Sequence, residues 1–341
     1  MRQLLVTTHR SKSKPCWLSR TRLRLDSRHC DTSSKSATTR GSFRRIAPCC
    51  APSRHNRRNS RNYKHSSLSS RCKRRFIRSR SFIQLGADPA QRLATLRSLR
   101  EDALHSAFTF VQQRLGPVDE RQPFRTEDRF IDATGDGDFH LLCCDILHFP
   151  TAKSVKQAFD SLSFYLSNME ISISETLSDL AILEDMDTVD TNITNRRILS
   201  ATQQGIMLEL NTVLFTEFVD GDAPYAVIAA QSVDDDVLHP YRPADRMRKD
   251  VSVAITISSF RRRRSENPFL SNSQRLRLEQ DNDEDDSELV VVMKRCGLVT
   301  LRRPQFDVAP EVLEEMFNGL HSWGQVMVTS MRDNLRAANA A

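Results

Sequence analysis

The sequence predicts an α+β fold in which a run of antiparallel strands packs against a long C-terminal helix, and three observations predict it. Between residues 169 and 303, several segments alternate apolar and polar residues, as half-buried strands do. Residues 89–115 and 310–335 instead place apolar residues at every third or fourth position, as amphipathic helices do. Residues 1–85 show neither pattern, so we expect them to lie outside the folded body.

Charge separates a basic N-terminal arm from an acidic body. Residues 1–80 hold 23 Lys and Arg but only two acidic residues, Asp26 and Asp31, which gives a net charge of +21. The remaining residues carry a net charge of −14. A segment of this composition cannot bury enough apolar surface to offset the entropy lost on ordering. We therefore expect residues 1–85 to form a disordered Arg/Ser-rich arm.

Three interpretations of the arm stay open. The first is a solvated tail with no function of its own. The second is a nuclear localisation signal or a nucleic-acid-binding patch, which the cluster 71-RCKRRFIRSR-80 favours. The third is mitochondrial targeting, because transit peptides are also rich in Arg and Ser and poor in acids. A basic leucine zipper is disfavoured, since Gly86 and Pro89 interrupt the continuous helix that it needs.

Hydropathy predicts that the protein is not integral to a membrane. No apolar run approaches the roughly 20 residues that span a bilayer. The first residues, MRQLLVTTHRSKSK, also lack the apolar core of a secretory signal. We expect an intracellular protein, cytoplasmic or nuclear, with mitochondrial targeting as an open alternative. The eight cysteines are then expected to be reduced thiols.

The body, residues 86–341, is expected to begin with a helix. Asp88 and Pro89 form a typical helix start, and Gly116-Pro117 a typical end. Next, segments 129–133 and 138–149 flank a Thr-Gly-Asp-Gly turn, which predicts a hairpin.

A second helix is predicted over residues 154–168, with Ser154 as its N-cap. The chain then turns to alternating or apolar segments, each expected to be a strand. These segments are 169–175, 196–203, 206–219, 225–233, 251–259 and 289–303. The acidic run 184–190 is expected in a loop.

Residues 261–288 separate four arginines from a following acidic run, without an apolar period, and are expected to form a disordered charged loop. After the last strand, one amphipathic helix starts at Pro310. At 1.5 Å per residue it would extend about 40 Å.

One stretch concentrates side chains that bind metals: 136-DGDFHLLCCDILHF-149. On a strand, His140, Cys144 and His148 share one face, while Cys143 and Asp145 share the other. At about 3.3 Å per residue, His140 and His148 are roughly 26 Å apart, too far to share one ion. We therefore interpret the stretch as part of the core and expect no metal and no cofactor.

Several sequence segments within residues 89–338 resemble those of a known protein family. The segments that carry the resemblance are FRTEDRFIDATGDGDFHLLCCDILHFP, SVKQAFDSLSFYLSNMEISISETLSDL, LHPYRPADRMRKDVSVAI, and ELVVVMKR followed by HSWGQVMVTSMR. They resemble an expanded oomycete family of START-like proteins related to the mating-specific group. The resemblance implies a helix-grip fold, in which a curved antiparallel sheet wraps the last helix and encloses an apolar cavity. Some members carry basic leucine zippers upstream, which this arm does not.

The implied cavity would be lined by one stripe of the last helix. Its members are Leu313, Met316, Phe317, Leu320, Trp323 and Met327. The same stripe could instead simply fill the core. In 239-HPYRPADRMRKD-250, Arg242, Arg246, Arg248 and Lys249 could contact a lipid phosphate or pair with the acidic body.

The sequence contains no G-x-S-x-G elbow, P-loop or G-x-G-x-x-G, so no catalytic residue is assigned and we expect no enzyme. The first hypothesis is a non-enzymatic module that binds a lipid or another apolar ligand under the C-terminal helix. The alternative is a nucleic-acid-associated regulatory protein that uses the basic arm, with the START-like domain as a sensor or partner-binding module.

Overall fold

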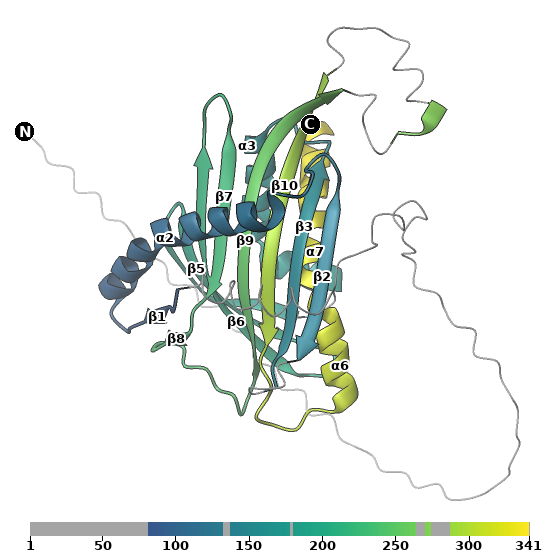
Figure 1. Ribbon diagram of the computed structural model, residues 1–341. Helices are drawn as coiled ribbons and strands as arrows, with labels where there is room; N and C mark the ends of the chain where they lie inside the picture. The colour runs from purple at the N-terminus through teal and green to yellow at the C-terminus, as the bar shows by residue number, and fades with distance from the viewer. Residues whose placement is uncertain (1–80, 132–136, 178–179, 264–269, 274–286, 341) are drawn as a thin grey trace, which may run out of the picture. The chain divides into compact units, whose positions relative to one another are not determined.

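The computed structural model describes residues 81–131, 137–177, 180–263, 270–273 and 287–340 (Figure 1). Residues 1–80 of the basic arm lie outside the described residues, as do most of the predicted hairpin turn and most of the predicted charged loop. Within the described part of the chain, no helix is both long and apolar enough to cross a bilayer.

The centre of the fold is an eight-stranded sheet whose successive neighbours are antiparallel. In spatial order its strands are β2 (Phe124–Ile131), β3 (Phe139–Phe149), β10 (Ser287–Leu301), β9 (Met247–Arg263), β7 (Tyr225–Ser232), β6 (Met207–Val219), β5 (Ile193–Ala201) and β4 (Leu180–Asp190). A small parallel pair, β1 (Gln84–Leu85) and β8 (Asp235–Asp236), lies beside it.

Helices cover both faces of this sheet (Figure 1). We call the outer face the one that carries α2 (Pro89–Leu115), which packs there in the largest buried apolar cluster. The inner face carries α3 (Val155–Ser167), α4 (Met169–Leu177), α6 (Pro310–Gly319) and α7 (Ser322–Ala340). A curved antiparallel sheet closed by C-terminal helices is the helix-grip arrangement, so the predicted α+β, helix-grip fold class is confirmed.

The first two predicted helices are confirmed, including their caps. The Asp88 carboxylate accepts a hydrogen bond from the Gln91 amide at 2.8 Å, which satisfies one free donor at the start of α2. Ser154 does the same for α3, where its hydroxyl accepts from the Gln157 amide at 3.1 Å. Gly116 ends α2, as predicted.

The strand predicted at residues 169–175 is wrong, because this segment is the helix α4. Met169, Ile171 and Ile173 alternate with polar residues, but Met169, Ile173 and Leu177 are also four apart and so share one helix face. That face packs against the sheet, and Ile173 is fully buried, whereas Ile171 is 51% exposed. Packing of the helical face decided between two patterns that the sequence supports equally.

The acidic run 184–190 is not a loop but part of β4, which pairs with β5 at the edge of the sheet. Charged side chains are common on edge strands because they face water and discourage pairing with other chains. Acidic composition alone therefore does not separate an edge strand from a loop.

The single long C-terminal helix is also wrong, because it breaks at Leu320 and His321 into α6 and α7. The two halves pack on different parts of the inner face. Helix α6 packs on a cluster that includes Leu141 and Met247, whereas α7 packs beside α3. Gly319, a weak helix former, precedes the break.

Two expected boundaries shift. Residues 81–85 belong to the packed body, since Ile83 and Leu85 are 0% exposed. The Ile83 amide also donates to the Asp234 carboxylate at 2.9 Å. Strands β9 and β10 also extend into the segment predicted as a charged loop, residues 261–288, and their pairing continues as far as Arg263 and Ser287. Burial and pairing order these residues despite their polar composition.

Candidate ligand-binding site

Strand β3 divides the metal-binding side chains of the opening motif between two faces. His140, Cys144 and His148 lie on the outer face, as predicted, and each histidine is held by a local hydrogen bond. His140 Nδ1 lies 2.9 Å from Thr300 Oγ1, and His148 Nε2 lies 2.8 Å from the Glu120 carbonyl. Across the described residues, no group of three or more His, Cys, Asp or Glu is arranged to hold a metal ion.

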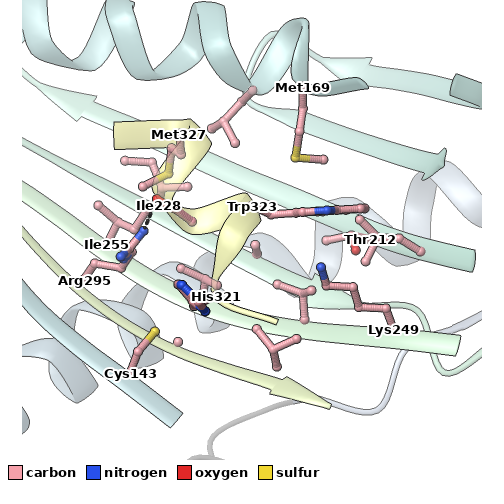
Figure 2. Close-up of a pocket in the computed structure, with 18 of the residues that line it drawn as sticks. Cys143, Met169, Thr212, Ile228, Lys249, Ile255, Arg295, His321, Trp323 and Met327 are labelled. Carbon is pink, nitrogen blue, oxygen red and sulfur yellow. Dashed lines mark hydrogen bonds between the residues drawn. The ribbon is translucent and has the colours of Figure 1, made fainter. Parts of the chain in front are cut away.

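A cavity of about 140 Å³ lies between the inner face of the sheet and the helices that cover it (Figure 2). Strands β6, β7 and β9 form its floor with inward side chains such as Leu214, Ile228 and Val253. Met169 from α4 and Met327 from α7 form part of its cover. Because successive strand residues alternate between faces, the apolar rows noted in the sequence form this floor.

The structure divides the six cavity residues predicted from the sequence. Leu320, Trp323 and Met327 line the cavity. Leu313, Met316 and Phe317 pack instead around the apolar cluster under α6. The break between α6 and α7 causes this division, because it turns the two halves of the stripe toward different clusters. Whether any of the six contacts a ligand stays a prediction.

Gly297 keeps part of the cavity empty, and the sequence reasoning missed it. A Cβ atom at this position of β10 would lie 3.3 Å from Val253 Cγ2 and 3.4 Å from Cys143 Sγ. Any larger side chain would extend into the cavity. A glycine inside a strand often marks such a close approach, which is the signal that could have identified it.

Basic groups are unusually frequent in this apolar lining. Arg125, Arg196, Lys249, Arg295 and His321 all line the cavity, whereas none of the described residues that line it is Asp or Glu. His321 Nδ1 lies 2.9 Å from Arg129 Nη2 and 3.0 Å from the Asn318 carbonyl. The other four basic groups fall into two sets with different surroundings.

The first set is balanced by carboxylates just outside the cavity. Arg295 Nε donates to Asp145 Oδ2 at 3.0 Å, and Arg125 Nη2 donates to Glu127 Oε2 at 2.7 Å. Asp145 is almost completely buried, so its pairing with Arg295 offsets the cost of removing both charges from water. The Arg295–Asp145 pair is part of the buried core, whereas the Arg125 side chain is 46% exposed.

The second set surrounds Trp323. Lys249 Nζ lies 3.6 Å from the centre of the indole ring, close enough for a strong cation–π contact. The nearby Thr212 hydroxyl is buried and has no hydrogen-bond partner. Figure 2 shows Lys249, Thr212 and Trp323 gathered on one side of the cavity. Thr212 is directly opposite Arg196 in the pairing of β5 with β6.

Arg196 is held on two sides and open on the third. It donates through Nη1 to the Leu166 carbonyl and through Nη2 to Met186 Sδ, but its Nε has no partner. Burial lowers the pKa of Arg196, and the charge of Glu170 acts in the opposite direction. Even so, an arginine keeps its charge in proteins, so a positive charge lies at this wall.

The lining groups that could act as nucleophiles are held in their neutral forms. Burial raises the pKa of Cys143 to about 11, so the reactive thiolate is scarce at neutral pH. Burial also raises the pKa of Tyr165, whose hydroxyl donates to the Trp323 carbonyl at 3.3 Å.

The four basic residues of segment 239–250 also have different surroundings: two form ion pairs, one is exposed and one lines the cavity. Arg246 lies 3.3 Å from Glu209, and Arg248 lies 2.6 Å from Asp250. These two therefore pair with the acidic body, one of the two alternatives predicted. Arg242 is exposed, and Lys249 alone among the four lines the cavity.

No protein-family model and no curated protein sequence matches the chain. Several solved structures show similarity to it, among them two human proteins. Human StAR-related lipid transfer protein 5 has a TM-score of 0.38 and 6% identity, over 71% of this chain and 99% of that one. Human STARD10 has a TM-score of 0.33 and 12% identity, over 75% of this chain and 82% of that one. Similarity at this level identifies neither a ligand nor an activity.

Proposed function

We propose that this chain is a non-enzymatic, START-like protein that binds a lipid or another apolar small molecule under its C-terminal helices. The observation that carries the proposal is the apolar cavity between the inner face of the sheet and α7. Ligand sites are typically concave and mostly apolar, with a few polar groups that fix orientation, and this cavity has both features. The six residues of the C-terminal stripe remain the proposed ligand neighbourhood.

The cavity volume limits what fits without rearrangement. An engineered cavity of about 150 Å³ holds a molecule the size of benzene, so 140 Å³ suits a small ring or a short chain. A longer acyl chain requires Trp323 and α7 to move away from the sheet. The break at Leu320 and His321 allows α7 to move without displacing α6.

Membership of the oomycete START-like family is part of the proposal. The basis of this assignment is the amino-acid sequence of the segments quoted from residues 89–338. An intracellular location, cytoplasmic or nuclear, is proposed with it.

Native mass spectrometry on the full chain, followed by lipid extraction, tests the proposal. We expect a stoichiometric adduct, or uptake of one ligand from a mixed panel of lipids and small apolar molecules. Ala230→Leu adds a side chain to the cavity lining and should abolish the adduct. Ala226→Leu, a matched change on the same strand and face, lies outside the lining and should keep it. An apo mass throughout would contradict the proposal.

A second function, in a nucleic-acid-associated regulator, is favoured by the charge of the arm alone. Twenty-three basic residues against two acidic ones would release many counterions from nucleic acid, so binding should weaken steeply as salt increases. Deleting residues 1–80 should abolish binding of the chain to DNA or RNA. Binding that is unchanged by the deletion would contradict this function.

A further inference from the structure

The polar groups around Trp323 come from three strands of the inner face. Arg196 lies on β5, Thr212 on β6 and Lys249 on β9. Their exposed fractions are 3%, 4% and 4%. Directly opposite residues of antiparallel strands have Cβ atoms about 5 Å apart, so the side chains of Thr212 and Arg196 begin next to each other on the cavity wall. All three residues line the same cavity.

Two donors in this patch have no hydrogen-bond acceptor among the residues that the structure describes. Thr212 Oγ1 and Arg196 Nε are buried without a hydrogen-bond partner. A buried donor without a partner destabilises the fold, so native proteins keep few of them, often at functional sites. Both atoms belong to residues that line the cavity, where a ligand atom could accept from them.

The charge of the patch indicates the kind of acceptor. The described residues that line the cavity include Arg196 and Lys249 but no carboxylate. A cation in an apolar site is stabilised most by an anion that also accepts hydrogen bonds. A neutral hydroxyl or ester ligand would offer these donors only an uncharged acceptor, and hydrogen bonds to an uncharged acceptor are weaker than charge-assisted ones.

From these observations we propose that Lys249, Thr212 and Arg196 form an anion subsite that binds the carboxylate or phosphate of an amphiphile whose apolar part fills the cavity. The inference rests on the proposed function and specifies its ligand class. The apolar walls explain why a bare ion is not the expected occupant, since a free phosphate would leave most of the cavity unfilled.

A matched ligand series separates this inference from the proposed function. Octanoate, octan-1-ol, octyl phosphate and inorganic phosphate are titrated into the full chain by isothermal calorimetry. We expect octanoate or octyl phosphate to bind about tenfold or more tightly than octan-1-ol, as charge-assisted hydrogen bonds allow. Equal affinity for octanoate, octyl phosphate and octan-1-ol would overturn the anion subsite and leave the proposed function intact.

Two further outcomes are informative. If inorganic phosphate binds as tightly as octyl phosphate, the apolar part of the ligand contributes nothing. The proposal of an amphiphilic ligand would then be overturned, and the site would be a simple ion site. If none of the three octyl compounds binds, and the mixed panel of apolar molecules also gives no adduct, both the inference and the proposed function fail.

Variants assign the effect to the patch. Lys249→Met should weaken octanoate about tenfold or more, and Lys249→Arg should retain most of the affinity. Thr212→Val keeps the shape of the side chain and should weaken octanoate about threefold to tenfold. Lys294→Met is the matched control, because Lys294 is also a buried lysine but pairs with Glu120 at 2.6 Å and does not line the cavity. Octanoate affinity that falls equally in the control would contradict the assignment.

Discussion

Two neighbouring residues of β6, Asn211 on the outer face and Thr212 on the inner face, differ in how their buried polar groups are satisfied. On the outer face, Arg92 Nη1 donates to Asp236 Oδ1 at 2.6 Å, and Asn211 donates to the other oxygen of Asp236 at 3.0 Å. Asn195 completes this network with a bond to Asn211 at 2.9 Å. On the inner face, Thr212 follows Asn211 directly in the chain but has no partner for its hydroxyl.

This difference in hydrogen bonding indicates that the polar groups of the outer face stabilise the fold, whereas those of the inner face can serve a ligand. Burial alone raises the pKa of Asp236, but hydrogen bonds from Arg92 and Asn211 outweigh it and lower the pKa. Both oxygens of the Asp236 carboxylate therefore accept hydrogen bonds within the protein, and these bonds fix α2 and β8 to the sheet. The inner patch is incomplete in the protein alone, as expected where a ligand supplies the missing acceptor.

The largest effect should come from breaking the outer network. Asp236→Asn removes the carboxylate and leaves the guanidinium of Arg92 buried, so the free energy of unfolding should fall by about 3–5 kcal/mol. Urea denaturation measures it. Arg97→Met, which breaks the exposed pair with Asp190, is the control and should leave the urea midpoint unchanged. A small change in Asp236→Asn would mean that the two faces do not differ in stability.

The next comparison lies within the inner face itself. Ala226 is in the closed part of the core beside α3, and its replacement by Leu should cost about 1–3 kcal/mol of unfolding free energy through overpacking. Ala230→Leu extends into the cavity and should leave the free energy of unfolding unchanged or higher. Thermal and urea unfolding of both variants measure the difference. Equal destabilisation would show that the cavity is filled in solution.

Neighbouring residues of β6 offer a smaller but sharper contrast. Asn211→Leu leaves Asp236 and Asn195 short of a partner, so the free energy of unfolding should fall by about 1–3 kcal/mol. Thr212→Val removes a hydroxyl that has no partner, so the same quantity should rise by up to about 1 kcal/mol without ligand. If Thr212→Val instead destabilises the apo protein, its hydroxyl is satisfied in solution and the contrast between faces disappears.

The smallest expected effect is a pH dependence on the outer face. Burial lowers the pKa of His148, whose Nε2 is hydrogen-bonded to the Glu120 carbonyl. Above the ordinary pKa of 6.5, the side chain is neutral in both states and contributes no pH dependence. As pH falls below 6.5, the unfolded chain takes up the proton first, so the free energy of unfolding decreases, by at most about 1.4 kcal/mol per pH unit.

The measurement is urea unfolding between pH 7.5 and pH 5 for the natural chain and for His148→Gln. The difference in unfolding free energy between the two should change with pH in that window. Parallel curves would mean that His148 titrates alike in the folded and unfolded states.

Local signals predicted the parts of the fold that depend on local interactions. Asp88 and Ser154 cap their helices through bonds to residues three positions away, which the sequence alone specifies. The alternation of apolar and polar residues along β6 and β9 likewise follows from the pleat of a strand, which points successive side chains to opposite faces. Segment 169–175 failed because its apolar residues fit either period, and only packing on the sheet selects the helix.

The candidate site could be predicted only in part for the same reason. Trp323 and Met327 belong to a helical stripe that was visible in the sequence, and both line the cavity. Thr212 and Arg196 were missed because only the pairing of β5 with β6 brings these two side chains together at the cavity. A lone Thr between Leu210 and Leu214 on the inward row of β6 was the only local sign. The break at Leu320 depends on the clusters beneath it, so no cap residue indicates it.

The position of α7 in the chain has a consequence for synthesis. Every strand of the sheet precedes α7 in the sequence, so a ribosome completes the strands before it makes the helix that covers the inner face. At about 5–20 residues per second, roughly two to eight seconds separate the completion of β10 from that of α7. During this interval the part of the apolar floor that α7 covers in the folded protein has no cover from that helix. A nascent chain is then most accessible to an amphiphile, and also most in need of a chaperone.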